Sequence, residues 1–139
     1  MINIDRDKKV LIDYSINMAK VLIKECQEFY PFAATIGIDA ELIPLLNYVG
    51  NDFPSSVDIL LDLTNLLNLQ LGKTKRAYAL TYDVLVTKNE KKSYALAIKI
   101  NHVESEEVVI YYFSYVLVND KNIEILDSWG EIVKNEYLS

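Results

Sequence analysis

The stretch E-F-Y-P-F-A-A-T-I-G-I-D at residues 28–39 marks the point where the repeating pattern of the sequence changes. Before it, apolar residues recur every three or four positions, which predicts an amphipathic helix over about 6–30. Pro31 ends that helix, because proline lacks a backbone N–H and pushes Tyr30 toward extended geometry. After it the period falls to two, which is typical of a strand over 32–39. This stretch therefore joins a helical layer to a sheet.

The first helix has a favourable residue for its N-terminus and one apolar stripe. Asn3 or Asp5 can cap its first turn. The stripe, which predicts the face that packs on the sheet, consists of Leu11, Tyr14, Met18, Val21, Leu22, Cys26 and Phe29. Cys26 is the single cysteine, so no disulfide forms within the chain, and its position on the stripe predicts a buried thiol.

The rest of the chain predicts one more helix and several strands. The strand at 32–39 forms a hairpin with 41–49, and Pro44 favours an edge position for the second strand. The second helix begins at Ser55 or Ser56 and ends at Gly72. The later strands are expected at 76–88, 94–103, 108–118 and 123–127. Because the strand at 108–118 is apolar on both faces, it is expected to be covered on both.

The predicted element order is α-β-β-α-β-β-β-β, with strands grouped rather than alternating with helices. This order favours an α+β fold, in which a mostly antiparallel sheet of about five to six strands carries two long helices packed on one side. The length of 139 residues fits a single domain over 1–139 with a substantial core.

The motif E-F-Y-P-F-A at 28–33, followed by T-I-G-I-D, resembles a signature of small uncharacterised bacterial proteins. Those proteins read E-F-Y-P-F-[AG], then two apolar residues and an Asp, and they continue with an Asp-Gly turn where this chain has Asp39-Ala40-Glu41. The stretch A-Y-A-L-T-Y-D-V at 77–84, with the strand at 94–103, resembles their second half. The resemblance implies a shared fold and carries no known activity.

Composition indicates a soluble globular protein. About half of the residues are hydrophobic and about a quarter are charged. No apolar run approaches the roughly 18 residues that cross a bilayer, and the N-terminal residues show no secretory pattern. We therefore expect a cytoplasmic protein that does not enter a membrane.

Negative charge is concentrated at one end of the chain. Residues 1–99 contain 12 acidic and 12 basic residues, whereas residues 100–139 contain 8 acidic and 2 basic residues, which accounts for the net charge of −6. Such a field repels nucleic acid and attracts basic partners. Trp129 lies among these carboxylates and is a candidate contact residue, although it is also a candidate cap for the core.

The sequence contains no convincing catalytic set, cofactor motif or metal site. Cys26 and His102 are poor candidates for a nucleophile and its base, because the first is expected inside a helix and the second at a strand end. No cluster of histidines and cysteines is present, and the glycines are scattered rather than grouped around a phosphate. A polar patch of six residues is the alternative; it would contain Thr35, Asp39, Thr81, Asp83, Lys99 and Asn101 on an alanine floor.

These observations favour a non-enzymatic protein-binding module, of the immunity or inhibitor type, that neutralises a basic partner. The predicted partner-binding residues are Glu104, Glu106, Glu107, Asp127, Trp129 and Glu131. A small-molecule binder or hydrolase-like enzyme that uses the polar patch is one alternative. A structural subunit that self-associates through the strand at 108–118 or the edge near Pro44 is another. The sequence does not set the oligomeric state.

Overall fold

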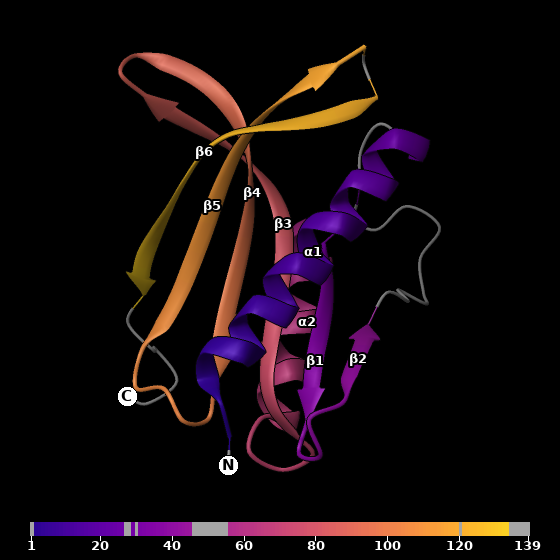
Figure 1. Cartoon of the computed structure of the whole chain (residues 1–139), viewed down its shortest axis with the longest axis vertical. Helices are drawn as coiled ribbons and strands as arrows, with labels where there is room; N and C mark the ends of the chain where they lie inside the picture. Colours follow the sequence, from indigo (N-terminus) through magenta and orange to yellow (C-terminus); the bar gives the residue numbers. More distant parts are fainter. Residues whose placement is uncertain (1, 27–28, 30, 46–55, 120, 134–139) are drawn as a thin grey trace.

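The computed structural model describes residues 2–26, 29, 31–45, 56–119 and 121–133, without the side chains of residues 26, 56, 57 and 88. The elements in chain order are α1 (Ile4–Cys26), β1 (Phe32–Gly37), β2 (Leu42–Leu45), α2 (Ser56–Gln70), β3 (Lys75–Lys88), β4 (Lys91–His102), β5 (Val108–Val118) and β6 (Asn122–Val133). The strands form one antiparallel sheet in the order β2-β1-β3-β4-β5-β6 (Figure 1). The predicted α+β fold is confirmed, and β2 with its Pro44 lies at an edge as predicted.

Helix α1 begins with a side-chain cap and packs on the sheet through one apolar face. Oδ1 of Asn3 accepts the backbone N–H of Arg6 at 3.0 Å, so Asn3 is the cap. The helix ends at Cys26, short of the predicted end at residue 30. Its buried residues follow a spacing of four; they are Asp7, Leu11, Ser15, Ala19 and Ile23.

Most of the predicted stripe packs against the core, since Leu11 is buried and Tyr14, Met18, Leu22 and Phe29 lie partly buried against it. Leu11 packs with the alanines of β1 and β3, and Ala19 packs with Phe32 and Leu96, whereas the bulky Val21 is 51% exposed. The prediction counted only large apolar side chains. The small residues Ser15 and Ala19 also belong to the buried face.

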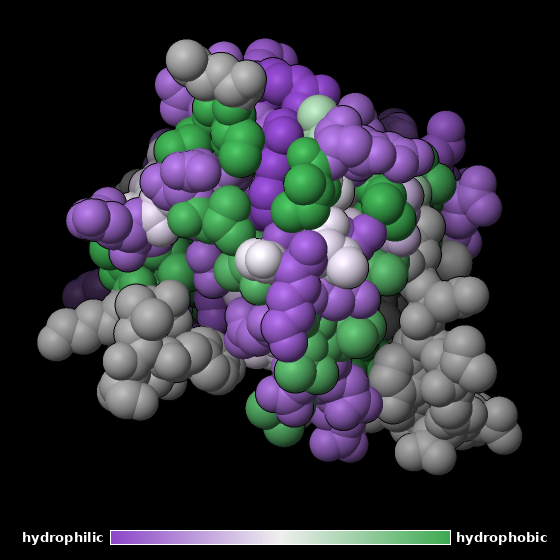
Figure 2. Space-filling view, turned by 90° about the horizontal axis from the view of Figure 1, so that it is seen from below, coloured by the Kyte–Doolittle hydropathy of each residue, from purple (hydrophilic) through white to green (hydrophobic). Residues whose placement is uncertain are grey.

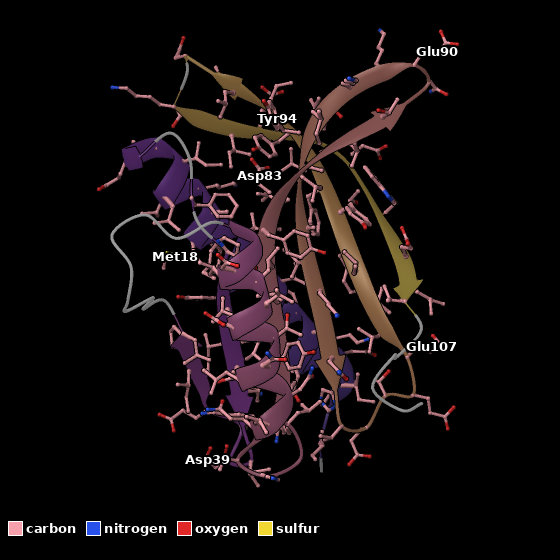
Figure 3. The ribbon with its side chains drawn as sticks, turned by 180° about the vertical axis from the view of Figure 1, so that it is seen from behind. Met18, Asp39, Asp83, Glu90, Tyr94 and Glu107 are labelled. Carbon is pink, nitrogen blue, oxygen red and sulfur yellow. The ribbon has the colours of Figure 1, made fainter. Side chains whose placement is uncertain are left out.

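The two helices lie on opposite faces of the sheet, which corrects the expectation that both pack on one side. Leu11 of α1 packs with Ala34 and Ala79, whereas Leu67 of α2 packs with Ala33 and Leu80. Because neighbouring residues in a strand point to opposite faces, α1 and α2 enclose β1 and β3 between them. Accordingly α1 lies in front of the sheet in Figure 1 and α2 in front of it in Figure 3.

The last two strands are less covered than predicted. Only Val108, Ser114 and Tyr115 are buried in β5, and Val116 to Val118 are exposed, so the expected cover on both faces is wrong. β6 is a strand of 12 residues rather than the short strand predicted at 123–127, and it contains no buried residue. Trp129 therefore lies within a strand, not in a tail after it. In Figure 1, α1 runs diagonally and leaves the lower parts of β5 and β6 open at the front.

Candidate functional site

Three aromatic side chains line up across the sheet on the side of α2. Tyr82 of β3 pairs with Ala97 of β4, which pairs with Tyr112 of β5, which pairs with Trp129 of β6. Tyr82 packs against the cluster under α2, and cross-strand partners share a face, so all four residues point to that side. We call these four residues the aromatic row. Because strands lie about 4.8 Å apart, the row spans about 14 Å.

The middle of the row is closely packed, and its outer end is a stacked pair. Ala97 is fully buried between the two tyrosine positions. The rings of Tyr112 and Trp129 are stacked, with centroids 5.3 Å apart and an angle of 18° between their planes. Trp129 is the only tryptophan in the chain. All three aromatic side chains remain partly exposed, so they form a surface rather than a core.

Carboxylates give this surface a negative character. Burial raises the pKa of the Tyr82 hydroxyl, and nearby Tyr112 and the charge of Glu131 raise it further. The pKa of Tyr112 is raised by burial and then by Glu131. Both phenols therefore stay protonated at neutral pH. Lys99 of β4 pairs with Ile110 of β5, which pairs with Glu131 of β6. The positive charge of Lys99 therefore lies in the same cross-strand row as Glu131.

Among the described residues, no helix lies over this face beyond β3. The buried cluster beneath α2 contains residues of β1 and β3, and none of β4, β5 or β6. Figure 3 shows α2 over β1 and β3, with the neighbouring strands β4 to β6 uncovered beside it. The aromatic row thus begins at the margin of the core and runs out onto an open surface.

The structure brings together three of the six predicted contact residues. Asp127, Trp129 and Glu131 alternate along β6 on the side of the aromatic row, with both carboxylates exposed. The other three, Glu104, Glu106 and Glu107, are exposed in the turn between β4 and β5. That turn begins at the buried end of β4 and is labelled at Glu107 in Figure 3. Glu107 lies three residues, or about 10 Å, before Ile110, the residue of β5 that pairs with Glu131.

The predicted polar patch does not form. Lys99 pairs with Leu80 on the α2 side, whereas Asp83 pairs with Leu96 on the α1 side. Thr35 and Thr81 are separated in the same way, because Thr35 pairs with Tyr78 and Thr81 pairs with Phe32. The patch is wrong because the sequence alone did not fix the registers between the strands.

Asp83 takes part in a different contact. The hydroxyl of Tyr115 donates a hydrogen bond to Oδ1 of Asp83 at 2.8 Å, and the ring of Tyr94 stacks near Tyr115. Burial raises the pKa of Asp83, although this hydrogen bond opposes the rise. Figure 3 shows Asp83 and Tyr94 close to where the two long hairpins separate. The contact links β3 to β5 there.

A buried ionic cluster at the opposite end is the most polar part of the interior. Arg76 donates two hydrogen bonds to Asp7, from Nε to Oδ2 at 2.9 Å and from Nη2 to Oδ1 at 2.8 Å. Nε2 of His102 lies 2.8 Å from the same Oδ2. Asp7 and His102 are fully buried and Arg76 is 8% exposed. Sequence reasoning missed the cluster, although Asp7 lies one helical turn before Leu11 on the buried stripe.

The geometry makes this cluster a structural contact rather than a reactive one. Nδ1 of His102 accepts the backbone N–H of Glu104 at 3.0 Å, which leaves Nε2 to donate to Asp7. Burial alone would raise the pKa of Asp7, but the hydrogen bonds from Arg76 and His102 lower it overall. Both carboxylate oxygens of Asp7 have donors, and the side chain is fully buried. The cluster joins the start of α1 to β3 and β4.

The described surface around this end is mixed in character. In Figure 2, hydrophobic and hydrophilic residues alternate over it. An open hollow of about 560 Å³ is lined by Ile2, Asn3, Ile4, Asp5, Lys8 and Ser105, and the buried ionic residues do not line it. In the described part of the chain, no three His, Cys, Asp or Glu residues are grouped to hold a metal. Whether the Cys26 thiol is buried lies outside the described side chains.

Comparisons with known proteins find no relative of this chain. No protein-family model matches the chain, and no match is found among the curated proteins or the solved structures. The resemblance of residues 28–39 to small bacterial proteins stays a prediction. Within the described residues, neither helix is long and apolar enough to cross a membrane.

Proposed function

We propose that this protein is a non-enzymatic binding module of the immunity or inhibitor type, which holds a basic protein partner on the α2-side face of β5 and β6. The observation that supports this most is the aromatic row on a face that no described helix covers. A cytoplasmic location is part of the same proposal.

The shape and composition of the surface favour a protein as the ligand. Tyrosine and tryptophan are enriched at protein interfaces, where they bring a large rigid area with a polar tip. The row of about 14 Å lies on an open strand face. A small molecule is held better in a concave pocket that buries most of its surface. A flat aromatic surface suits a protein of similar curvature.

The charge of the surface favours a basic partner. Asp127 and Glu131 flank Trp129 along β6, and the net charge of the chain is −6. Complementary charge speeds the encounter of two proteins and disfavours partners of the same sign. The same field disfavours nucleic acid, whose phosphates are negative.

Affinity capture with matched variants tests this proposal. The tagged chain is incubated with a lysate of its host, beside Trp129→Ala, Glu131→Lys and the control Glu90→Lys. Glu90 is exposed in the turn between β3 and β4, far from Glu107 in Figure 3. We expect one basic protein to be retained by the wild type and by the control. It should be lost with Trp129→Ala, reduced with Glu131→Lys, and released from the wild type by high salt.

Capture that does not depend on the surface would contradict the proposal. If the same proteins were retained by all four chains, the α2-side face would not be the binding surface. If nothing basic were retained by the folded wild type, the function itself would be wrong. Circular dichroism of each variant distinguishes a lost contact from a lost fold.

A further inference from the structure

β6 offers a partner a strand edge as well as a face. It stands last in the strand order, so no described strand pairs with its outer side. An edge strand presents a row of backbone N–H and C=O groups that another strand can use. The opposite edge is different, because β2 has four residues and contains the exposed Pro44. Of the two edges, β6 is the one with enough length to accept a strand.

The lower half of β6, residues 128–133, is regular, and the charged residues of the whole strand are all acidic. Residues 122–133 contain no Pro, Lys or Arg. The register with β5 shifts between Ser114 and Tyr115, opposite the stretch from Ile125 to Asp127. From Ser128 to Val133 the pairing is continuous. The bulge therefore interrupts only the upper half of the strand.

The two faces of this lower half differ in chemistry. On the α2 side, Asp127 and Glu131 place carboxylates on either side of Trp129. On the α1 side, Ile132 is 63% exposed, and the ring of Tyr111 lies across Gly130. A strand added here would meet acidic and aromatic groups on one face and apolar groups on the other.

We propose that an extended segment of the partner, with Lys or Arg alternating with apolar residues, pairs with the outer edge of β6 as an additional strand. This inference rests on the proposed function and names how the partner binds. Cations of the segment lie on the α2 side opposite Asp127 and Glu131, where opposite charges on paired strands attract. A cation near Trp129 is also attracted by the indole ring. The apolar residues lie beside Ile132.

A second copy of this chain is a poorer occupant of the same edge. Antiparallel self-pairing centred on Trp129 would place Asp127 of one copy opposite Glu131 of the other. Like charges directly opposite each other destabilise a strand pair. The charge pattern of β6 therefore favours a basic segment over self-association.

Synthetic peptides test the backbone pairing without any change to the protein. The probe is a nine-residue peptide of alternating Arg and Val, and binding is measured by the fluorescence of Trp129, the only tryptophan. Two further peptides carry backbone N-methyl groups on the Arg residues or on the Val residues. Successive N–H groups of a strand point to opposite edges, so only one of these sets faces β6. We expect one methylated peptide to bind at least about tenfold more weakly and the other to bind like the parent.

The remaining outcomes overturn the inference in distinguishable ways. If both methylated peptides bind like the parent, or if a peptide of the same composition with all Arg residues at one end binds equally well, strand pairing is wrong. If the parent peptide fails to bind while the captured basic protein still requires Trp129, the pairing is wrong and the proposed function stands. If neither ligand binds, both are wrong.

Discussion

β4 and β6 each have 12 residues, yet seven residues of β4 are buried and none of β6 is. β4 lies inside the sheet, with α1 over Leu96 and Ile98, and it ends at His102 in the buried ionic cluster. β6 lies at the edge, and its carboxylates Glu124, Asp127 and Glu131 are all exposed. The difference indicates a division of roles: the strands around β4 hold the fold together, and β5 with β6 present a surface.

The largest effect is expected from breaking the buried ionic cluster. Asp7→Ala leaves the guanidinium of Arg76 and the N–H of His102 buried without their acceptor. Removing one partner of a buried ion pair costs about 3–5 kcal/mol of unfolding free energy. Urea denaturation measures the loss, with Asp7→Asn as a second variant of similar shape. Lys9→Ala, which removes an exposed ion pair with Asp13, is the control and should change little.

A small loss from Asp7→Ala would mean that the cluster is dispensable and that β4 owes its stability to packing alone. Partner binding, unlike stability, should not change in these variants. Variants that still fold should bind the partner like the wild type, because the cluster lies away from the aromatic row.

The second test makes the same substitution in both strands. Ile98 is fully buried in β4, whereas Ile132 is 63% exposed in β6. Ile98→Ala should cost about 2–5 kcal/mol, because it leaves a cavity between the sheet and α1. Ile132→Ala should change stability by no more than about 0.5 kcal/mol. Thermal or urea unfolding compares the two, and equal losses would show that β6 belongs to the core.

Acid should lower the stability of the fold mainly by protonating the buried Asp7. The pKa of Asp7 is held below its ordinary value of 3.8, so the folded state binds that proton less readily than the unfolded chain. The stabilisation is complete above pH 3.8 and is lost as the pH falls toward the folded pKa. The pKa of Asp83 is raised, so its effect has the opposite sign. Wild type should therefore lose more stability between pH 6 and pH 3 than Asp7→Asn does; parallel curves would contradict this.

Much of the fold could be predicted from the sequence, because each element has a local signal. Pro31 and the change of period located the start of β1, and Pro44 placed β2 at an edge. Helix faces were harder to predict. Neither the small residues of the α1 face nor the buried Asp7 has a signal in apolar periodicity. Their burial depends on the residues of the sheet that they contact, such as Arg76 and His102 for Asp7.

The candidate site was predicted only in part, because it depends on register. Trp129 and its neighbouring carboxylates were identified from charge, but Tyr82 and Tyr112 were not assigned to the same surface. Asn89 and Glu90 both have positive φ, of 52° and 66°, as a two-residue hairpin turn requires. A turn of that length pairs Tyr82 with Ala97. The prediction assigned four residues, 89–92, to the turn, so it missed the pairing that builds the aromatic row.

The smallest effect concerns β2, the other edge. Ala40 has φ of 72° in the turn before β2, a conformation that costs an L-residue about 1–2 kcal/mol and glycine little. Ala40→Gly should therefore raise the unfolding free energy by about 1 kcal/mol, since relief of strain exceeds the entropy that glycine adds to the unfolded chain. Urea denaturation measures the gain.

The control for this substitution is Ala97→Gly, at an ordinary strand position in the aromatic row, where glycine should destabilise. A loss of stability from Ala40→Gly would mean that the turn tolerates alanine without strain. A gain would show that β2 is held at its edge by a strained turn, in addition to its short length and its proline. Peptide binding should be unchanged by Ala40→Gly, because β2 and β6 lie at opposite edges of the sheet. The same variant therefore separates the edge that closes the fold from the edge that we propose to bind a partner.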